Sequence, residues 1–378
     1  MRQLGRTQVG LVTDGRSTIP DDARRLADYE RYAATTLVPE AWRHIQEGVD
    51  SGPAATSNRA SFDRFRLVPR VMTDLRDGST AITLFGTPHA APILLAPLAY
   101  QRIAHPDGEL ATVRAATALA TGMVVSTLSS VPLEEVANAA RQAAADLGTQ
   151  VAPLWFQLYF QQDRDWNIAL VRRAEAAGYT AIVLTVDASV KRSSFVLPAG
   201  VDAANLRGMP KVSQTTHAGG RILFGTALIE AAPRWDDLAW LREQTRLPLI
   251  LKGVLSPTDA HRAVELGCDG VIVSNHGGRV LDGLVSPLEM MPAIVDAVAG
   301  RVPLLLDGGV RSGTDIVKAL ALGASAVLIG RPQMHALAVA GMPGVAHILH
   351  ILRAELEFAM AQIGCATPAA IQVDRLKR

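Results

Sequence analysis

The chain has little of several features that mark other classes of protein. Its 378 residues include only two cysteines, Cys268 and Cys365, which lie far apart and outside any Cys-x-x-Cys or metal-ligand spacing. The sequence therefore predicts two reduced, buried thiols, with no disulfide framework and no metal site. The 37 basic side chains nearly balance the 36 acidic ones, so no global charge attracts nucleic acid or an anionic membrane.

Long apolar runs are also missing. We find no run long enough to span a bilayer, and the first residues, MRQLGRTQVGLVTDGRSTIPDD, carry charge and glycine where a signal peptide needs an apolar stretch. Hydrophobic residues nevertheless make up 49% of the chain, enough to bury a large core. These observations predict a soluble globular protein of the cytoplasm.

Short apolar runs recur from residue 92 onward and are the most informative pattern in the sequence. Runs this short and this continuously apolar are typical of strands buried on both faces, as in a parallel sheet. Helix-like stretches such as PLEEVANAARQAAADLG separate most of them, and several end in the glycine that closes a helix. Eight such runs predict a (β/α)8 TIM barrel, with strands at 92–99, 123–129, 153–159, 181–187, 247–253, 270–275, 302–309 and 326–331.

A doubly wound open sheet is the alternative fold. A dinucleotide-binding version would require GxGxxG after the first strand, but PLAYQR stands there, so we favour the barrel. Residues 1–91 are then an N-terminal helical and extended segment that packs on the barrel of residues 92–367. Residues 188–234 form a long active-site loop after the fourth strand, and residues 368–378 are a C-terminal tail.

The ends of the predicted strands carry polar side chains, glycines or a proline. In this fold the carboxyl ends of the strands line the active site, although any single residue of this kind is usually a cap or turn residue. DGGVRSGTD and IGRP, at the seventh and eighth strands, combine glycine amides, a helix N-terminus and an arginine, which favours binding of a phosphate group there.

The stretch SNHGGRVLDG, residues 274–283, follows the buried run Gly270-Val271-Ile272-Val273. Two adjacent glycines weaken any regular element because they lose the most backbone freedom on folding. A requirement other than folding therefore explains this sequence.

These motifs resemble those of the FMN-dependent 2-hydroxy acid oxidase and dehydrogenase family, to which glycolate oxidase, lactate oxidase and mandelate dehydrogenase belong. The similarity runs from about residue 28 to about residue 367 and includes WFQLYF, LTVD, LKGV, SNHGGR and DGGVR. The stretch APLAYQRIAHPDGE is most similar to the 4-hydroxymandelate oxidase branch. The resemblance implies an FMN-dependent oxidation of an (S)-2-hydroxy acid of mandelate type to the 2-oxo acid.

The resemblance also implies roles for individual residues. His276 would be the catalytic base, and Asp187 would orient it and stabilise its protonated ring. Arg279 would hold the substrate carboxylate, and Tyr159 would hydrogen-bond a substrate oxygen. Lys252 would lie near flavin N1, where negative charge gathers on reduction.

The remaining implied contacts are to the cofactor. Flavin contacts would come from Pro97, Ala99, Ser129, Gln157, Thr185, Lys252 and Ser274, and the phosphate site from Asp307, Gly309, Arg311, Gly330 and Arg331. The ordinary alternative for each of these residues is a turn, a packing contact or a solvated surface position.

Two departures from the family pattern concern the substrate. AWRHIQEG places His44 where the family usually has a tyrosine, and LTVDASVKRSSFVLP lacks the segment that supplies a second arginine, so Arg192 is the candidate substitute. A modified substrate, such as an amide, ester or carrier-bound 2-hydroxyacyl group, is therefore an alternative.

Two further functions stay open at this stage: an FMN- or phosphate-binding barrel isomerase, and a degenerate family member that binds flavin without turnover. The expected electron acceptor is oxygen or another acceptor, and the expected assembly is a homotetramer.

Overall fold

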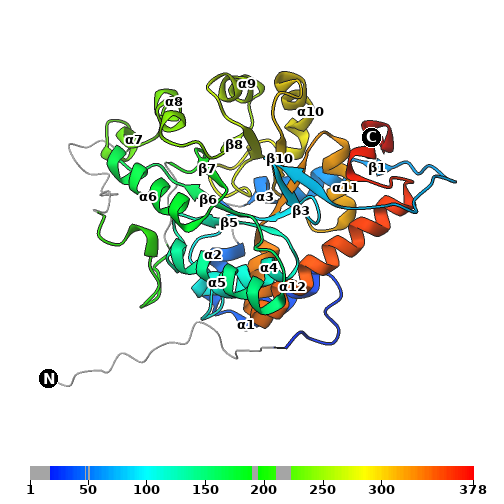
Figure 1. Ribbon diagram of the computed structural model, residues 1–378, viewed down its shortest axis with the longest axis horizontal. Coiled ribbons are helices and arrows are strands. Elements are labelled where there is room, and N and C mark those ends of the chain that lie inside the picture. Colours follow the sequence, from blue (N-terminus) through cyan, green and yellow to red (C-terminus); the bar gives the residue numbers. More distant parts are fainter. Residues whose placement is uncertain (1–17, 47, 50–51, 190–194, 210–222) are drawn as a thin grey trace.

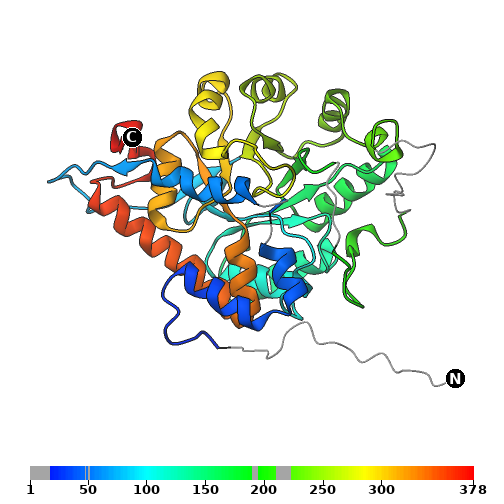
Figure 2. The same cartoon turned by 180° about the vertical axis from the view of Figure 1, so that it is seen from behind.

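The computed structural model describes residues 18–46, 48–49, 52–189, 195–209 and 223–378. Within them, eight parallel strands close into a barrel in the order β10-β11-β4-β5-β6-β7-β8-β9 (Figures 1 and 2). The strands are β4 (Ile93–Leu95), β5 (Gly122–Ser126), β6 (Leu154–Leu158), β7 (Ala181–Thr185), β8 (Leu249–Val254), β9 (Gly270–Ser274), β10 (Leu304–Asp307) and β11 (Ala326–Ile329). The predicted (β/α)8 fold is confirmed, and the open-sheet alternative is wrong because β11 pairs with β4.

A helix follows each barrel strand before the next strand begins. These helices are α4 (Glu109–Ala118), α5 (Leu133–Leu147), α6 (Arg164–Ala177), α8 (Trp235–Gln244), α9 (Pro257–Glu265), α10 (Pro287–Val298), α11 (Gly313–Ala321) and α12 (Arg331–Gln362). Local chemistry sets several of their ends. The Ser256 and Ser312 side chains cap α9 and α11, and left-handed glycines, Gly148 and Gly178, end α5 and α6.

The core has two parts. A small cluster fills the barrel interior, with Trp155 as its largest fully buried member. The larger cluster lies between the strands and the surrounding helices. This arrangement explains the continuously apolar strands, because their side chains alternate between two buried environments.

Three helices and a hairpin precede the barrel: α1 (Leu26–Thr36), α2 (Pro39–Gln46), α3 (Pro53–Asp63), β2 (Ile82–Leu84) and β3 (Thr87–His89). The hairpin covers the end of the barrel where the strands begin. Leu84 belongs to the interior cluster, and Phe85 approaches Gly270 at the start of β9 so closely that a side chain there would lie 2.7 Å from its ring. The active end of the barrel is therefore the opposite one.

The last residues pack on the N-terminal segment. Strand β12 (Leu376–Lys377) pairs antiparallel with β1 (Arg66–Leu67). Residues 68–76 extend from the body of the molecule beside this pair (Figure 1). The segment predicted as a long loop at 188–234 contains, in its described parts, the short helices η2 (Ala204–Leu206) and α7 (Ala227–Glu230).

Helix α12 corrects one expectation from the sequence. It is long and apolar enough to cross a membrane by length and composition, although 72% of its most apolar window is buried inside the molecule. Its backbone leaves the helical conformation at Ala340 and Gly341, and it packs against α1, α4 and α11. Burial of this kind is typical of a core helix of a globular protein.

Candidate functional site

The site begins where the barrel interior changes from apolar to polar. Seven interior residues of the small cluster are each followed, two positions later, by a polar residue or a glycine. Side chains of a strand alternate with period two, so these later residues also face the barrel interior. The polar or glycine members are Ser126, Gln157, Thr185, Lys252, Ser274, Asp307 and Gly330, following Val124, Trp155, Val183, Ile250, Ile272, Leu305 and Leu328. The six side chains among them are buried. The barrel is thus closed at its carboxyl end by a polar layer.

Lys252 is the centre of this layer. Its ammonium group forms an ion pair of 2.6 Å with Asp307 and donates a hydrogen bond of 2.9 Å to Ser274, which in turn donates to Asp307 at 2.8 Å. Burial lowers the pKa of Lys252, but Asp307 and Asp187 outweigh burial and raise the pKa above its usual value. Lys252 is therefore a fixed buried cation, as the sequence interpretation requires.

A second layer lies two residues beyond the first and contains Tyr159, Asp187 and His276. The His276 Nδ1 lies 2.8 Å from the Asp187 carboxylate, and its Nε2 lies 3.3 Å from the Tyr159 hydroxyl. His276 has a left-handed backbone, with φ of 58°, a conformation that costs energy for a residue with a side chain. Strain of this kind persists where the surroundings hold the residue, and here Ser274 accepts the His276 backbone N–H at 3.0 Å.

Asp187 fits closely against strand β8. At Gly253, which has φ of 105°, a Cβ atom would lie 2.5 Å from the Asp187 Cγ, so glycine is required there. The pairing of β8 with β9 shifts register between Lys252 and Val254 at this point. Burial raises the pKa of Asp187, but the hydrogen bond and charge of His276, with Lys252, lower it below its usual value. Asp187 is thus an ionised partner for the imidazole.

An arginine corner beside these layers is formed by Arg279, Arg311 and Arg331. Burial, with the charges of Arg279 and Arg311, lowers the pKa of Arg331 to about 10. Burial also lowers the pKa of Arg311. Next to them, a Cβ at Gly330 would meet open space, whereas a Cβ at Gly277 would lie 3.4 Å from the Arg331 guanidinium. Cations that repel each other at the N-terminus of α12 favour an anionic ligand.

Several buried polar atoms fit a flavin mononucleotide. Gln157 Nε2, Thr185 Oγ1 and Arg331 Nη2 are buried and have no hydrogen-bond partner among the residues that the structure describes. Buried polar atoms are normally paired, so a ligand with acceptors along the barrel axis and an anion at the arginine corner would satisfy them. The ring of FMN fits the polar layer beside Lys252, and its phosphate fits Arg311 and Arg331.

The glycines of SNHGGR have a structural explanation as well. A Cβ at Gly278, which has φ of 72°, would lie 2.4 Å from the backbone nitrogen of Ala55 in α3. The turn can therefore pack against α3 only with glycine there. The packing places Arg279 beside α2, where it donates to the backbone carbonyls of Ile45 at 3.0 Å and His44 at 2.6 Å.

Some predicted cofactor contacts need correction. The Ser129 hydroxyl donates to the Val131 carbonyl beyond the end of β5, whereas Ser126 pairs in register with Gln157 and contacts its amide oxygen at 3.1 Å. Ser126 is thus the serine of the polar layer, and the alternation along β5 could have identified it. Pro97 and Ala99 follow β4 at the same end of the barrel, and their flavin contacts stay predictions.

Of the residues assigned to the phosphate site, Asp307 belongs to the polar layer instead, whereas Gly309 has a packing requirement of its own and its phosphate contact stays a prediction. Asp307 contacts Lys252 and Ser274, and its negative charge would repel a phosphate. At Gly309, a Cβ would lie 2.1 Å from the Asn58 carbonyl of α3, so packing already requires this glycine.

The substrate residues that depart from the family pattern are only partly described. The ring of His44 stacks on Phe195 with centroids 4.1 Å apart, and its carbonyl contacts Arg279. Arg192 lies outside the described residues. Among the residues that the structure describes, no cluster of three or more His, Cys, Asp or Glu side chains could hold a metal ion.

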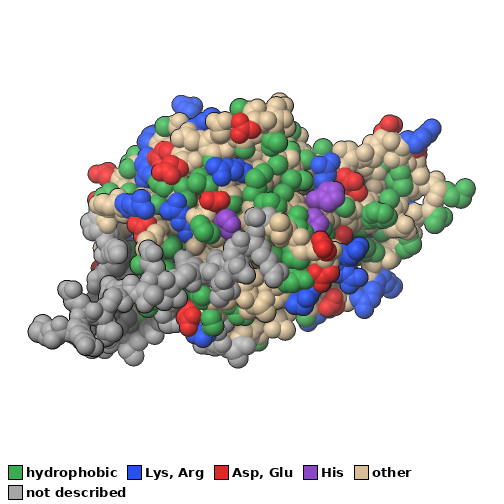
Figure 3. All heavy atoms as spheres, turned by 90° about the horizontal axis from the view of Figure 1, so that it is seen from below, with side chains coloured by type: hydrophobic (Ala, Val, Ile, Leu, Met, Phe, Trp, Pro, Cys, Tyr) green, Lys and Arg blue, Asp and Glu red, His purple; other side chains and the backbone are tan. Residues whose placement is uncertain are grey.

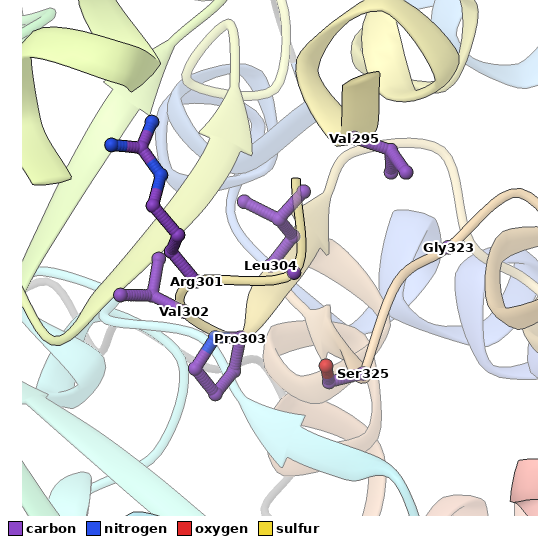
Figure 4. Close-up of a pocket in the computed structure, with 8 residues that line it drawn as sticks. Val295, Arg301, Val302, Pro303, Leu304, Gly323 and Ser325 are labelled. Carbon is purple, nitrogen blue, oxygen red and sulfur yellow. The ribbon is translucent and has the colours of Figure 1, made fainter. Parts of the chain in front are cut away.

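A pocket at the other end of the barrel is separate from this site. Val295, Arg301, Pro303, Gly323 and Ser325 are among its lining residues, at the turns that lead into β10 and β11 (Figure 4). Strand beginnings in this fold contribute to stability, whereas the chemistry occurs at the strand ends. We therefore place the functional site at the polar layer and not at this pocket.

Comparison with known proteins agrees with the geometry. The chain is 48% identical to an L-lactate oxidase of Alicycliphilus denitrificans, over 95% of this chain and 97% of that relative. It is 43% identical to a 4-hydroxymandelate oxidase of Amycolatopsis orientalis, over 91% of this chain and 96% of that relative. A crystal structure of mandelate oxidase with (S)-2-phenylpropionate has a TM-score of 0.82 and 41% identity, covering 94% of this chain and 98% of that one.

The family model described as FMN-dependent dehydrogenase matches residues 33–378, which include the polar layer, the second layer of Tyr159, Asp187 and His276, and the three arginines. The chain belongs to the FMN-dependent dehydrogenase family.

Proposed function

We propose that the protein oxidises an (S)-2-hydroxy acid of aromatic, mandelate-like type to the 2-oxo acid and passes the electrons to oxygen. The observation that carries the proposal is the joint placement of His276, Asp187 and Tyr159 above the buried cation Lys252. FMN, when bound, accepts the two electrons of the reaction at its N5 position.

The chain supplies the proton chemistry. His276 Nε2 takes a proton from the substrate, at C2 or at the hydroxyl group, while Asp187 holds Nδ1 and stabilises the ring when it becomes charged. Tyr159 lies 3.3 Å from the same Nε2, so its hydroxyl is placed to hydrogen-bond the substrate oxygen. Burial first, together with the charge of Asp187, raises the pKa of Tyr159, so the phenol stays protonated.

Lys252 supplies electrostatic stabilisation. It is 3% exposed and remains charged because Asp307 and Asp187 compensate for burial. A fixed cation in a site that excludes water lowers the energy of negative charge that develops close to it. Its place in the polar layer suits the part of the flavin that becomes more negative on reduction.

The carboxylate of the substrate and its side chain would contact different residues. Arg279 would hold the carboxylate, because a guanidinium binds carboxylates through two parallel hydrogen bonds. The backbone carbonyl of His44 contacts this arginine, and the His44 ring stacks on Phe195, so these two rings are the candidates for an aromatic surface near the carboxylate. This surface favours a mandelate-like acid, which agrees with the 4-hydroxymandelate oxidase and mandelate oxidase relatives.

A lactate-like substrate is the second candidate, since the L-lactate oxidase of A. denitrificans is also similar to this chain. Comparing the rate of flavin reduction by (S)-mandelate and by L-lactate at equal concentrations decides between them. An amide, ester or carrier-bound 2-hydroxyacyl substrate would instead reduce the flavin faster than either free acid. An isomerase or a protein without turnover would show no reduction with any of the three.

The cofactor has its own test. We expect the purified protein to be yellow and to release FMN on denaturation, since neither the sequence nor the described site suggests a covalent attachment. Recovery of FAD, or of no flavin after reconstitution, would contradict the cofactor assignment.

We further propose a homotetramer in the cytoplasm. The segment after β1 exposes Val71 (80%) and Met72 (101%), and hydrophobic side chains gather at the tip of this protrusion in the view from below (Figure 3). Met72 also has a left-handed backbone, with φ of 60°. An exposed apolar tip on a strained backbone is unusual for a monomer and supports contact with a second copy.

A further inference from the structure

One backbone carbonyl is shared by the two arginines assigned to different ligands. The Ile45 oxygen accepts a hydrogen bond of 3.0 Å from Arg279 Nη1 and one of 3.3 Å from Arg331 Nε. Ile45 lies in the last turn of α2, where carbonyls lack partners within the helix and form the negative end of its dipole. The end of α2 therefore touches both the proposed carboxylate anchor and the proposed phosphate anchor.

The two arginines need this contact because they repel each other. The charge of Arg279 is among the causes, after burial, that lower the pKa of Arg331 to about 10. Two like charges in a buried corner stay close only where electronegative groups hold them. A displacement of the Ile45 carbonyl would therefore move both guanidinium groups.

The Gln46 side chain holds this helix end in place. Its amide oxygen lies 3.0 Å from His335 Nε2 of α12, and its amide nitrogen donates to the Glu30 carboxylate of α1. The Glu30 carboxylate only accepts, which sets the orientation of the amide, and the His335 Nε2 must then be the donor. Gln46 thus joins three helices beside the shared carbonyl.

The surroundings of His335 fit this arrangement. His335 is fully buried, and its ring lies against Trp42 of α2 with centroids 5.5 Å apart. Burial, with the charges of Arg311 and Arg331, lowers the pKa of His335 to about 3, so the ring is neutral. A neutral ring with its proton on Nε2 is the form that donates to Gln46.

We propose that Gln46 is a positioning residue that sets the affinity for both ligands, by holding the Ile45 carbonyl between Arg279 and Arg331. The assignment of a carboxylate to Arg279 rests on the proposed function, whereas the phosphate at Arg331 rests on the family and on the buried, mutually repelling arginines. Gln46 touches neither ligand in this account and acts through the arginines.

The test uses Gln46→Met, which keeps the length of the side chain and removes both hydrogen bonds. We expect the dissociation constant of benzoylformate, a 2-oxo acid, to rise about tenfold, and that of FMN to rise by a similar factor, each corresponding to about 1.4 kcal/mol. The rate of flavin reduction at saturating substrate should change less than about twofold, because His276 and Asp187 are not altered. Glu40→Gln, on the exposed first turn of α2, is the matched control and should change neither constant.

A double-mutant cycle separates positioning from a general loss of structure. If Gln46 acts through Arg279, the effect of Gln46→Met on benzoylformate binding disappears in an Arg279→Lys background. Should Gln46→Met fail to fold, Gln46→Asn keeps the amide but shortens its reach, and the same pattern with a smaller amplitude is expected.

Two results would overturn the proposal: a lowered melting temperature with both dissociation constants unchanged, or an undiminished effect in the Arg279→Lys background. If the wild-type protein binds no 2-oxo acid, the proposed function fails, and the FMN titration alone decides. Weaker FMN binding in Gln46→Met then supports the positioning role through Arg331, and unchanged binding refutes it.

Discussion

At the scale of single residues, the catalytic assignment depends on His276. Its two ring nitrogens have different partners: Asp187 holds Nδ1, and Nε2, which lies near the Tyr159 hydroxyl, is the nitrogen that the proposed function assigns to the substrate proton. The left-handed backbone of His276 costs energy for a residue with a side chain, and Ser274 holds it by accepting the backbone N–H.

We predict that His276→Ala retains FMN and loses substrate-driven flavin reduction by at least about two orders of magnitude, the usual contribution of a general base. FMN is retained because the polar layer and the arginines are unchanged. Anaerobic stopped-flow absorbance measures the reduction rate. A variant that is reduced at a near-normal rate would show that another residue takes the proton.

His44 permits a second prediction at this scale. A histidine gains charge as pH falls through about 6.5, so an anionic ligand beside it should bind more tightly at pH 6 than at pH 8. His44→Phe keeps the ring that stacks on Phe195 and removes the charge, so this pH dependence should disappear.

The dissociation constant of benzoylformate, followed by flavin absorbance from pH 8 to pH 6, tests this prediction in both proteins. Identical profiles in wild type and His44→Phe would mean that His44 has no part in recognition of the acid.

At the scale of elements, the β2–β3 hairpin closes the inactive end of the barrel with a buried histidine. His89 is 2% exposed, and Trp155 lies edge-on with ring centroids 6.1 Å apart. Within the described part of the chain, neither His89 ring nitrogen has a hydrogen-bond partner. Burial lowers the pKa of His89 to about 4. The unfolded chain therefore binds a proton at this residue more readily than the folded one.

The sign of the resulting pH effect follows directly. Stability from a neutral His89 is present above pH 6.5 and is lost as pH falls toward 4, because unfolding then takes up a proton. When the pH is lowered from 7 to 5, we predict that the free energy of unfolding falls by about 2 kcal/mol less in His89→Leu than in wild type.

Urea denaturation at each pH, with FMN in excess, measures the difference. His261→Leu, at an exposed position on α9, is the control. Equal losses in wild type and His89→Leu would mean that the buried ring does not titrate in this way.

The sequence could predict the elements well because each barrel strand is short, apolar and followed by a helix. For the same reason it placed Gln157, Thr185, Lys252 and Ser274 near the carboxyl ends of strands, since each lies among the last residues of a recognisable strand, while their flavin contacts stay predictions. The resemblance implied Ser129, but STLSS contains three serines, and only the strand register shows that Ser126 is the one beside Gln157. The partner of Asp307 could not be predicted, because the Lys252 ammonium comes from a strand 55 residues earlier in the chain.

Contacts between distant segments were also beyond the sequence. Nothing in AWRHIQEG indicates that the carbonyls of its helix end contact Arg279 and Arg331, since any residue type supplies a carbonyl. The requirement for glycine at position 253 likewise depends on Asp187, which belongs to another strand end.

At the scale of the whole molecule, the exposed tip at Val71 and Met72 leads to a prediction on assembly. We expect light scattering at micromolar concentration to give a mass about four times 40.2 kDa. Val71→Asp with Met72→Asp should lower this mass, because charges at an apolar contact disfavour association. Leu147→Asp, at the exposed end of α5, is the control. A strict monomer in the wild type would contradict the tetramer.

The central claim is that the residues of the two layers at the carboxyl end of the barrel support the oxidation of a 2-hydroxy acid, with its electrons passing to bound FMN. The most direct measurement is the absorbance of the purified yellow protein near 450 nm after anaerobic addition of (S)-mandelate, and separately of L-lactate. We predict that the flavin bleaches within seconds with at least one of these acids and that its colour returns when oxygen is admitted. A flavin that stays oxidised with both acids at millimolar concentration would contradict the account.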